Sequence, residues 1–599
     1  MKRTFLKKAC LVLCIAAMLC SCSQSTEQST EQSSEQQSSS SSVSSLEDYV
    51  VSAPADKTYT FVDNSPVFSL DDTFYPCSIK VDLLTATDAE IYYTLDGSEP
   101  TRESSLFSES ILFECEKSDF PTAHTVKAKA FYADGTESAV SVHTYFCAKN
   151  VDERFSTAVF SITADPALLT EGPDGILYGD NHELRGSESE REIHLQAWDK
   201  SGNEILSQYC GIRIYGGASR ESSIKSFKLF ARKRYASGIG SFKTDIFGTP
   251  VEDSSGDIIA KYDKLVLRNS GNDFQFAFIR DELNQNLAMQ AGFTDYEAVV
   301  PAVCYVNGEY YGFFWLHENY CDDYFKNKYP NENAQGEFMI LEGTETGKNV
   351  EEGDETEPFA EEFNAMYESF CAMDLTDEAN YALLCEFMDV ENYLDYYAFN
   401  IYINNKDWPQ NNYKCYRYSP LEGESEYDGV YDGRWRFLLH DMDYTYGMYE
   451  QTEVMANYNN IGQILKEGSE RYSPLFEKLM HRSDCREYFT AKINELASGV
   501  LSEQNIVDTL GVMSSMRYFE QNYYYKHIEN MRNKGADDLW TYEGHLTYYV
   551  QLIKDFAAQR SDYILSYVDS ELAKYDNATE SEGSSEELSQ SSESSETSE

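Results

Sequence analysis

Two aromatic-rich stretches in the second half of the chain, 404–418 and 435–447, carry most of the information about the fold. The first reads NNKDWPQNNYKCYRY and follows a helical repeat of apolar residues over 390–401, with Asp389 well placed as an N-cap. The second reads WRFLLHDMDYTYG, which is typical of a buried strand that runs into a polar loop. We therefore expect a helix, a loop broken at Trp408-Pro409, a short strand, and a second strand that ends in acidic residues.

The polar residues of these stretches indicate a particular chemistry. Asp407 and Asn412 lie five positions apart on the loop, and Asp441 and Asp443 follow the second strand. In phosphoryl transfer of the protein-kinase type, a loop Asp accepts the hydroxyl proton, an Asn five positions on holds metal, and a second Asp holds metal at the nucleotide phosphates. Asp and Asn are also common turn formers, so this spacing is a weak signal by itself.

The net charge limits the partners of the protein. The 599 residues include 48 Lys and Arg against 102 Asp and Glu, a formal net charge of -54. Such a chain does not bind nucleic acid or an anionic membrane surface by electrostatic attraction. A phosphate group would need a locally basic pocket or a metal ion. The length allows roughly two to four domains.

The N-terminus predicts export. Basic residues precede an apolar run over 9–19, which is too short to span a membrane and is typical of a secretory signal peptide. The sequence Leu19-Cys20-Ser21-Cys22 resembles a bacterial lipobox. We expect residues 1–22 to be a lipoprotein signal peptide and a lipid on Cys22 to anchor the protein to the outer face of a bacterial cell membrane. A plain secreted protein cleaved nearby is the alternative.

Two low-complexity segments flank the rest. Residues 23–45 are almost entirely Ser, Glu, Gln and Thr, and residues 577–599 are acidic and Ser-rich. Neither can bury a core, so both are predicted to be disordered. No CxxC pair or His cluster accompanies the ten cysteines beyond residue 22, so zinc is not expected, although a disulfide among Cys77, Cys115 and Cys147 stays open.

Residues 59–147 predict a small β-domain. Apolar residues alternate over 79–83 and 126–130, and Asp96-Gly97 and Asp134-Gly135 are hairpin-type turns. The stretch 91–101, IYYTLDGSEPT, resembles the β-sandwich module of the chitobiase/β-hexosaminidase C-terminal type. The resemblance implies a fold and leaves open whether the module binds surface carbohydrate.

A strand, a glycine turn and a second strand occupy 212–231, IRIYGGASRESSIKSFKLFA. A hairpin of this kind can cover a nucleotide and pair a cation with its phosphates. Gly216 and Gly217 would form the turn, and Arg220 and Lys225 are the expected phosphate partners. The remaining basic residues are expected on a solvated strand face: Lys228, Arg232, Lys233 and Arg234.

Taken in order, six segments resemble the CotH-type (spore coat protein H) kinase family, an atypical branch of the protein-kinase-like fold. They are VFSITADP, IYGGASRESSIKSFKL, LVLRNSGND, YVNGEYYGFFWLHE, NNKDWPQNN and WRFLLHDMDYTYG, and they span about 152–575. The resemblance implies an α+β protein with an atypical protein-kinase-like bilobal domain after the β-sandwich. It also implies transfer of the ATP γ-phosphoryl group, with Mg²⁺ or Mn²⁺, to Ser or Thr hydroxyls of a surface or coat protein.

The resemblance assigns a role to each matching residue. Asp407 would be the catalytic base, Asn412 and Asp441 metal ligands, and Lys225 a contact to the nucleotide phosphates, while Asp443 is the alternative to Asp441. The chain departs from protein-kinase patterns because no His-Arg precedes Asp407, no Asp-Phe-Gly is present, and Ile224 stands where many relatives have Lys.

Two other functions remain open at this point. A non-catalytic surface lipoprotein, binding carbohydrate or protein on a kinase-like scaffold, would also account for the anchor, the spacer and the β-sandwich. A glycoside hydrolase with paired carboxylates is the third class. It ranks last because carboxylates are so numerous that almost any pair could be nominated.

Overall fold

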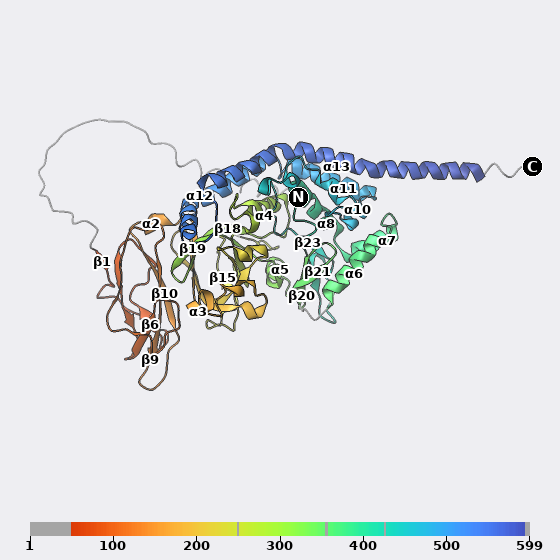
Figure 1. Ribbon diagram of the computed structural model, residues 1–599. Coiled ribbons are helices and arrows are strands. Elements are labelled where there is room, and N and C mark those ends of the chain that lie inside the picture. The colour runs from red at the N-terminus through yellow and green to blue at the C-terminus, as the bar shows by residue number, and fades with distance from the viewer. Residues whose placement is uncertain (1–48, 248–250, 354–357, 425–426, 594–599) are drawn as a thin grey trace, which may run out of the picture. The chain divides into compact units, whose positions relative to one another are not determined.

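The computed structural model describes residues 49–247, 251–353, 358–424 and 427–593, with the side chains of residues up to 576 except Glu352 and Glu543. The predicted signal peptide with Cys22, the predicted linker over 23–45 and the last six residues of the tail lie outside the described residues. The described chain is an α+β protein whose N-terminal region is rich in sheet (Figure 1).

The N-terminal region forms the predicted β-sandwich. One sheet has the order β1 (Val50–Val51), β4 (Ser78–Val81), β8 (Ile111–Phe113). The other has the order β3 (Phe74–Tyr75), β10 (Ser141–Cys147), β9 (Ala123–Phe131), β6 (Glu90–Thr94), β7 (Ser105–Leu106), and β2 (Val67–Phe68) pairs with β5 (Leu83–Leu84). The expected alternation is present, because Ile79 and Val81 are buried on either side of exposed Lys80.

A closed seven-stranded barrel follows. Its order is β11 (Ala158–Thr163), β12 (Arg191–Trp198), β13 (Glu204–Tyr215), β14 (Ser226–Phe230), β17 (Lys264–Arg268), β19 (Glu309–His317), β18 (Val299–Val306). The predicted strand, glycine turn and strand over 212–231 are β13, the 3₁₀ turn η4 (Ala218–Glu221) and β14. The smaller elements around the barrel are α2 (Val151–Arg154), α3 (Pro166–Leu169), η2 (Asp180–Glu183), β15 (Phe242–Lys243), β16 (Lys261–Tyr262), α4 (Arg280–Ala291) and α5 (Asp322–Lys328).

The second half combines a four-stranded sheet with helices. The sheet has the order β21 (Lys348–Glu352), β20 (Glu337–Gly343), β22 (Tyr413–Ser419), β23 (Arg436–Leu438). The helices are α6 (Phe359–Ala372), α7 (Glu378–Phe387), α8 (Val390–Ile403), α9 (Asn460–Ile464), α10 (Pro474–Leu479), α11 (Ser483–Ser498), α12 (Glu503–Asn533) and α13 (Glu543–Glu593). Helix α8 begins as predicted, because the Asp389 carboxylate accepts a hydrogen bond from the Asn392 amide at 3.2 Å.

The C-terminal tail differs from the prediction of disorder that starts at residue 577. Helix α13 continues without a break to Glu593. Helix α13 packs against α11 and α12, and its buried side chains lie between Leu546 and Leu572, upstream of this extension. Within the described chain, no helix is both long and apolar enough to span a bilayer.

Candidate functional site

A cleft of about 690 Å³ is lined by the barrel on one side and by the second half of the chain on the other. The barrel contributes residues of β13, β14 and β17 and the glycine loop between β13 and β14. The facing wall comes from the loop after α8, the segment after β23, and Glu342 and Glu351 of β20 and β21. The two motif stretches at 404–418 and 435–447 therefore meet at one cleft.

The barrel wall of the cleft follows from strand register. Arg213 of β13 pairs with Lys228 of β14, while Phe227 and Leu229 on either side are fully buried in the core. Since side chains alternate across a strand, Lys228 and Arg213 point to the cleft face. This corrects the expectation that Lys228 and Arg232 belong to a solvated strand face, because both line the cleft.

Lys225 lies differently from the expectation. Its ammonium group donates to the carbonyl oxygens of Arg220 at 2.5 Å and Ser222 at 3.0 Å, and it does not line the cleft. Burial lowers its pKa. Lys225 thus holds the backbone of the loop. Ser226 and Lys228 share the cleft face of β14. Because side chains alternate along a strand, the Lys225 side chain points away from the cleft.

The glycine loop itself lines the cleft as expected. Gly216, Gly217 and Arg220 are all on the wall. The Arg220 guanidinium is turned to the backbone, where it donates to the carbonyl oxygens of Gly216 at 2.6 Å and His182 at 2.9 Å. Burial lowers the pKa of Arg220 to about 10. Arg220 therefore shapes the loop in this structure.

On the opposite wall, the structure brings Asp407, Asn412 and Asp441 together. The Asn412 side-chain amide donates to the Asp407 carboxylate at 3.1 Å and lies 3.5 Å from the Asp441 carbonyl oxygen. Asn412 and Asp441 have φ of 53° and 50°, a region that Asn and Asp tolerate better than most residues. Burial, and after it the charge of Asp441, raises the pKa of Asp407 above its usual value, although hydrogen bonds from Asn411 and Asn412 oppose this.

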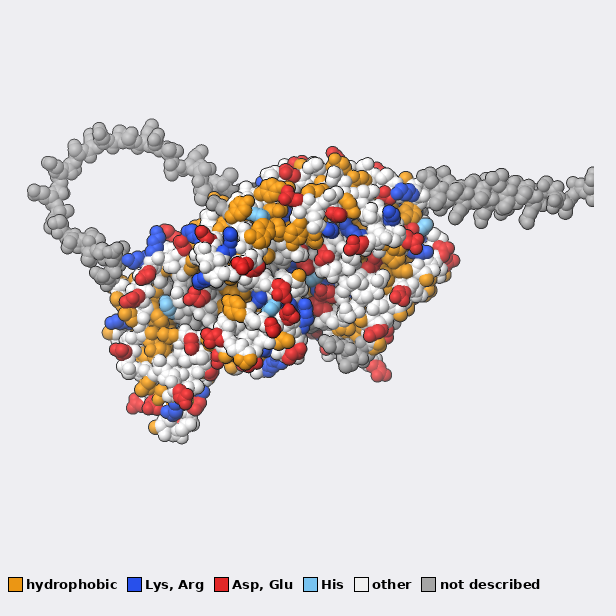
Figure 2. Space-filling model, in the orientation of Figure 1, with side chains coloured by type: hydrophobic (Ala, Val, Ile, Leu, Met, Phe, Trp, Pro, Cys, Tyr) orange, Lys and Arg blue, Asp and Glu red, His pale blue; other side chains and the backbone are white. Residues whose placement is uncertain are grey.

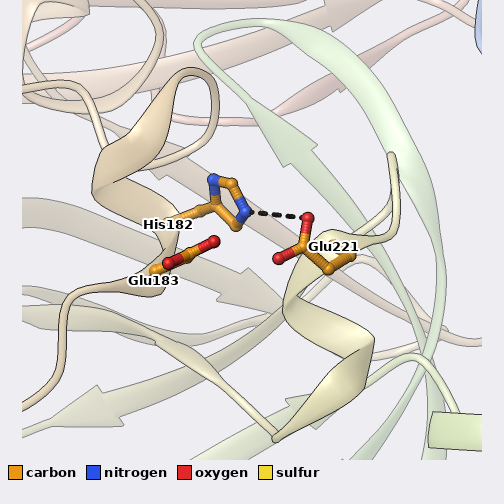
Figure 3. A group of neighbouring side chains, drawn as sticks. All are labelled: His182, Glu183 and Glu221. Carbon is orange, nitrogen blue, oxygen red and sulfur yellow. Dashed lines mark hydrogen bonds and ion pairs between the residues drawn. The ribbon is translucent and has the colours of Figure 1, made fainter.

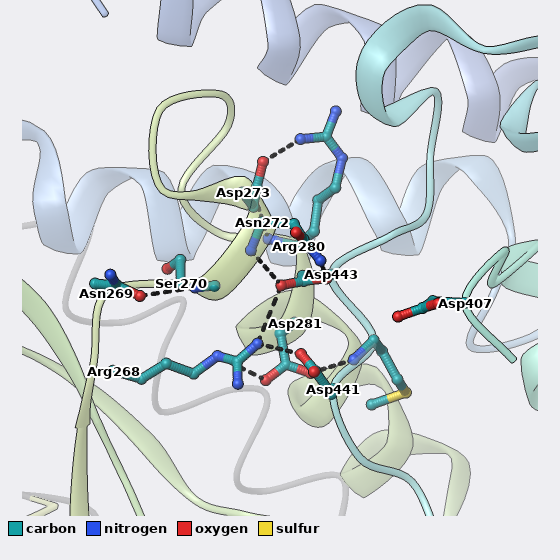
Figure 4. A network of polar contacts seen from close by, with 12 residues as sticks. Arg268, Asn269, Ser270, Asn272, Asp273, Arg280, Asp281, Asp407, Asp441 and Asp443 are labelled. Atoms are coloured by element: carbon teal, nitrogen blue, oxygen red, sulfur yellow. Dashed lines mark hydrogen bonds and ion pairs between the residues drawn. The ribbon is translucent and has the colours of Figure 1, made fainter. Parts of the chain in front are cut away.

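Arg268, at the end of β17, ties the two walls together. Its guanidinium pairs with the carboxylates of Asp441 and Asp443, the latter at 3.1 Å, and its Nε lies 3.6 Å from Asp281 (Figure 4). Burial alone would lower the pKa of Arg268, but these carboxylates hold it well above its usual value. Asp281 also accepts a hydrogen bond from the Met442 amide at 2.8 Å, which fixes the segment between the two aspartates.

Asp441 and Asp443 differ in access. The Asp441 side chain is 28% exposed, while that of Asp443 is 1% exposed and accepts hydrogen bonds from the Asn272 backbone at 2.8 Å and its side chain at 3.2 Å. Burial and the neighbouring Asp441 raise the pKa of Asp443 well above its usual value. The geometry therefore offers Asp441 to the cleft and engages Asp443 in holding the 271–272 turn.

Several lining residues were missed in the sequence. Glu342 and Glu351 both pair with buried Lys414, at 2.9 and 2.7 Å, and His440 lies beside them with no hydrogen-bond partner for Nδ1 among the described residues. Burial, followed by the nearby Lys414 charge, lowers the pKa of His440 to about 4. These residues meet only through strand pairing in the β21-β20-β22-β23 sheet, which sequence spacing does not reveal.

The residues present suit a metal–nucleotide complex. Carboxylate and amide oxygens of Asp407, Asn412 and Asp441 are the donors that Mg²⁺ and Mn²⁺ prefer. The barrel wall concentrates cations in an acidic chain: Arg185, Arg213, Arg220, Lys228, Arg232, Lys264 and Arg268. On the face shown in Figure 2, basic side chains are otherwise interspersed with acidic ones. Arg213 and Arg232 pair with the buried side chain of Glu190, at 2.6 and 2.9 Å, so a phosphate on this wall would share these cations with a carboxylate.

Fold and cleft define an α+β protein with an N-terminal sheet-rich region and an acidic site facing a basic wall. The chain belongs to the CotH kinase protein family, whose match covers residues 212–564. A second match, to the chitobiase/beta-hexosaminidase C-terminal domain, covers residues 71–142. Both resemblances found in the sequence are thereby confirmed. No curated protein matches the chain.

Proposed function

We propose that this protein transfers the γ-phosphoryl group of ATP to Ser or Thr hydroxyls of a protein substrate in the 690 Å³ cleft. The observation that carries the proposal is the meeting of Asp407, Asn412 and Asp441 opposite a wall rich in Arg and Lys. The barrel would act as the nucleotide-side lobe and the helical half as the second lobe, in a bilobal kinase-like arrangement. Metal and substrate contacts of this kind are the main requirements of phosphoryl transfer.

Each residue has a task in this mechanism. Asp441 and Asn412 would hold a divalent ion, which supplies positive charge to bridge the phosphates. Lys228 and Arg213 would orient the phosphates from the barrel wall, and Arg268 keeps Asp441 ionised and in place. Asp407 would accept the proton of the substrate hydroxyl, and its hydrogen bond from Asn412 orients the carboxylate toward that task.

We further propose that the protein is exported and held by a lipid on Cys22, with residues 23–45 as a spacer. Residues 59–147 would form the sandwich domain and 152–575 the kinase-like domain. The basis is the N-terminal sequence pattern alone for the anchor and the family matches for the domains.

Nucleotide binding tests the site directly. ATP with Mn²⁺ should raise the melting temperature of the full chain, because a ligand that binds only the folded state stabilises it. Asp441→Asn should lose the rise that depends on Mn²⁺. The matched control is Asp428→Asn, because it removes a carboxylate from an exposed position before β23 and outside the cleft. A wild-type protein that shows no rise would contradict the proposal and favour a surface binding protein.

A further inference from the structure

Three side chains outside the cleft lining converge in the gap between η2 and η4. His182 and Glu183 lie at the end of η2, and Glu221 ends η4 (Figure 3). One ligand atom from each lies within 4.8 Å of the others. An imidazole with two carboxylates is a ligand set that suits Zn²⁺ and similar divalent ions. The residues come from two separate segments, so sequence spacing does not show this group.

The contacts of His182 leave its Nε2 directed at a carboxylate. Its Nδ1 contacts the carbonyl oxygen of Gly179, which can only accept, so Nδ1 carries a proton. Its Nε2 faces the Glu221 carboxylate at 3.3 Å. A lone pair and a carboxylate repel unless a proton or a metal ion lies between them. Metal-bound histidines usually donate their other ring N–H to a carbonyl or carboxylate, as His182 does.

The distance and the third side chain are those of a metal site, although the distance alone also fits a hydrogen bond. Two ligands bound tetrahedrally to zinc, each at about 2.0–2.1 Å, lie about 3.3 Å apart, which equals the Nε2–carboxylate distance seen here. Glu183 adds a second carboxylate to the same gap. Both carboxylates are exposed, that of Glu221 by 69%, so an ion from solvent can reach all three side chains.

We propose that His182, Glu183 and Glu221 form a site for a divalent transition-metal ion, with Zn²⁺ as the best match, that clamps η2 to the glycine loop. The two segments are already joined, since Arg220 donates to the carbonyl oxygens of His182 at 2.9 Å and Leu184 at 3.2 Å. Residues on both sides of the clamp, Arg185 and 216–220, line the cleft. A bound ion therefore restrains part of the cleft wall.

A second group of the described chain has a similar composition, but it is buried, whereas the His182 group is half-buried to exposed. Asp281, Glu282 and His317 also cluster. There, an imidazolium on His317 pairs with both carboxylates, one at each ring nitrogen: Glu282 at 3.2 Å and Glu297 at 3.6 Å. That group needs no metal ion to account for its geometry.

Calorimetry on the full chain without nucleotide tests the clamp, with Zn²⁺ as the probe and Co²⁺ as a spectroscopic one. We expect one Zn²⁺ per chain whose binding depends on these residues, and a Co²⁺ complex with visible absorption of low-coordinate type. His182→Ala and Glu221→Gln should each weaken Zn²⁺ binding by at least about tenfold, since loss of even an outer-shell partner costs 10–100-fold.

Two controls make the result decisive. His481→Ala removes an imidazole that faces Glu477 at 3.0 Å on the exposed surface beside α10, and it should leave Zn²⁺ affinity unchanged. Asp441→Asn should also leave it unchanged, so that a failure of the kinase proposal stays distinct from a failure of this one. Equal Zn²⁺ affinity in the wild type and a folded His182→Ala variant would overturn the proposal, and so would a wild type that binds no Zn²⁺.

Discussion

At the level of single residues, the direction of a side chain decides which lysine of the β14 region lines the cleft. Lys225 and Lys228 are three positions apart, yet Lys225 binds loop carbonyls and Lys228 lines the cleft beside Arg213. The sequence contained the signal, because Phe227 and Leu229 are the apolar partners in the alternation around Lys228. The resemblance to the CotH-type family assigned the phosphate contact to Lys225. The register of β14, which places Lys228 on the cleft face, could not be predicted without its partner strand.

Lys228→Ala and Lys225→Ala are therefore expected to act differently. Lys228→Ala should weaken ATP binding without lowering the melting temperature appreciably, because the side chain faces the cleft. Lys225→Ala should lower stability by about 1–3 kcal/mol, because it leaves the buried carbonyls of the loop without their donor. Calorimetry with ATP and urea unfolding separate the two effects, and equal loss of ATP affinity with unchanged stability in both variants would contradict the assignment.

Gly271 is expected to tolerate no side chain. Its φ is 56°, and a Cβ would lie 2.3 Å from the Asp443 carboxylate and 2.8 Å from the Arg268 guanidinium. Gly271→Ala should therefore displace the group that holds Asp441 and abolish metal-dependent ATP binding. Gly256→Ala also places an Ala at a positive φ, 86°, but with open space around it, and is the matched control. Loss of binding in both variants would point to general destabilisation.

His317 gives a pH-dependent contribution to stability. Burial would lower its pKa, but Glu282 and Glu297 raise it to about 9 against an ordinary value of 6.5. A raised pKa in the folded state stabilises the protein fully below pH 6.5, and this stabilisation is lost as pH rises through about 9. The free energy of unfolding should thus fall across this range, by at most about 1.4 kcal/mol for each pH unit. The free energy of unfolding of His317→Gln should approach that of the wild type over that pH range. A difference that stays constant with pH would contradict a charged His317 in the folded state.

At the level of elements, helix and strand ends position the site. Helix α8 ends at Ile403, the following Asn404 has a φ of 55°, and the chain then turns through Asp407 to β22. These boundaries were predictable, because the helical repeat, the Asp389 cap and the break before Trp408-Pro409 are local signals. The contribution of Asn272 was not, because this residue reaches Asp443 only after β17 is placed in the barrel beside the 435–447 stretch.

A buried ion pair joins two elements far apart in the chain. Arg154 of α2 donates to Glu520 of α12 at 2.8 Å, and both side chains are fully buried. Removing one partner leaves an unpaired buried charge, so Glu520→Ala should destabilise the protein by about 3–5 kcal/mol. Glu529→Ala, at an exposed position of the same helix, should cost less than about 0.5 kcal/mol. Chemical denaturation measures the free energy of unfolding of both variants. A loss of less than about 0.5 kcal/mol in Glu520→Ala as well would show that the Arg154–Glu520 pair does not stabilise the contact between α2 and α12.

At the level of the whole molecule, the chain sets a small basic wall within a strongly acidic protein. The order of elements, the β-sandwich and the family were readable from local patterns and motifs, because each lies within one stretch of sequence. The basic wall and the Glu342, Glu351 and His440 lining were not, because they depend on pairing between strands. The helical course of 577–593 was also missed, because composition does not show that α13 has a packed start.

Phosphoryl transfer by the full chain is the most direct test of the proposed function. With ATP, Mn²⁺ and Ser/Thr-rich protein substrates, mass spectrometry should find phosphorylated Ser or Thr. Asp407→Asn should slow the transfer by about 10²–10⁴-fold, the usual contribution of a general base, while ATP binding persists. A wild type that binds ATP with Mn²⁺ but transfers phosphate no faster than Asp407→Asn would contradict the assignment of Asp407 and, with it, the proposed catalysis.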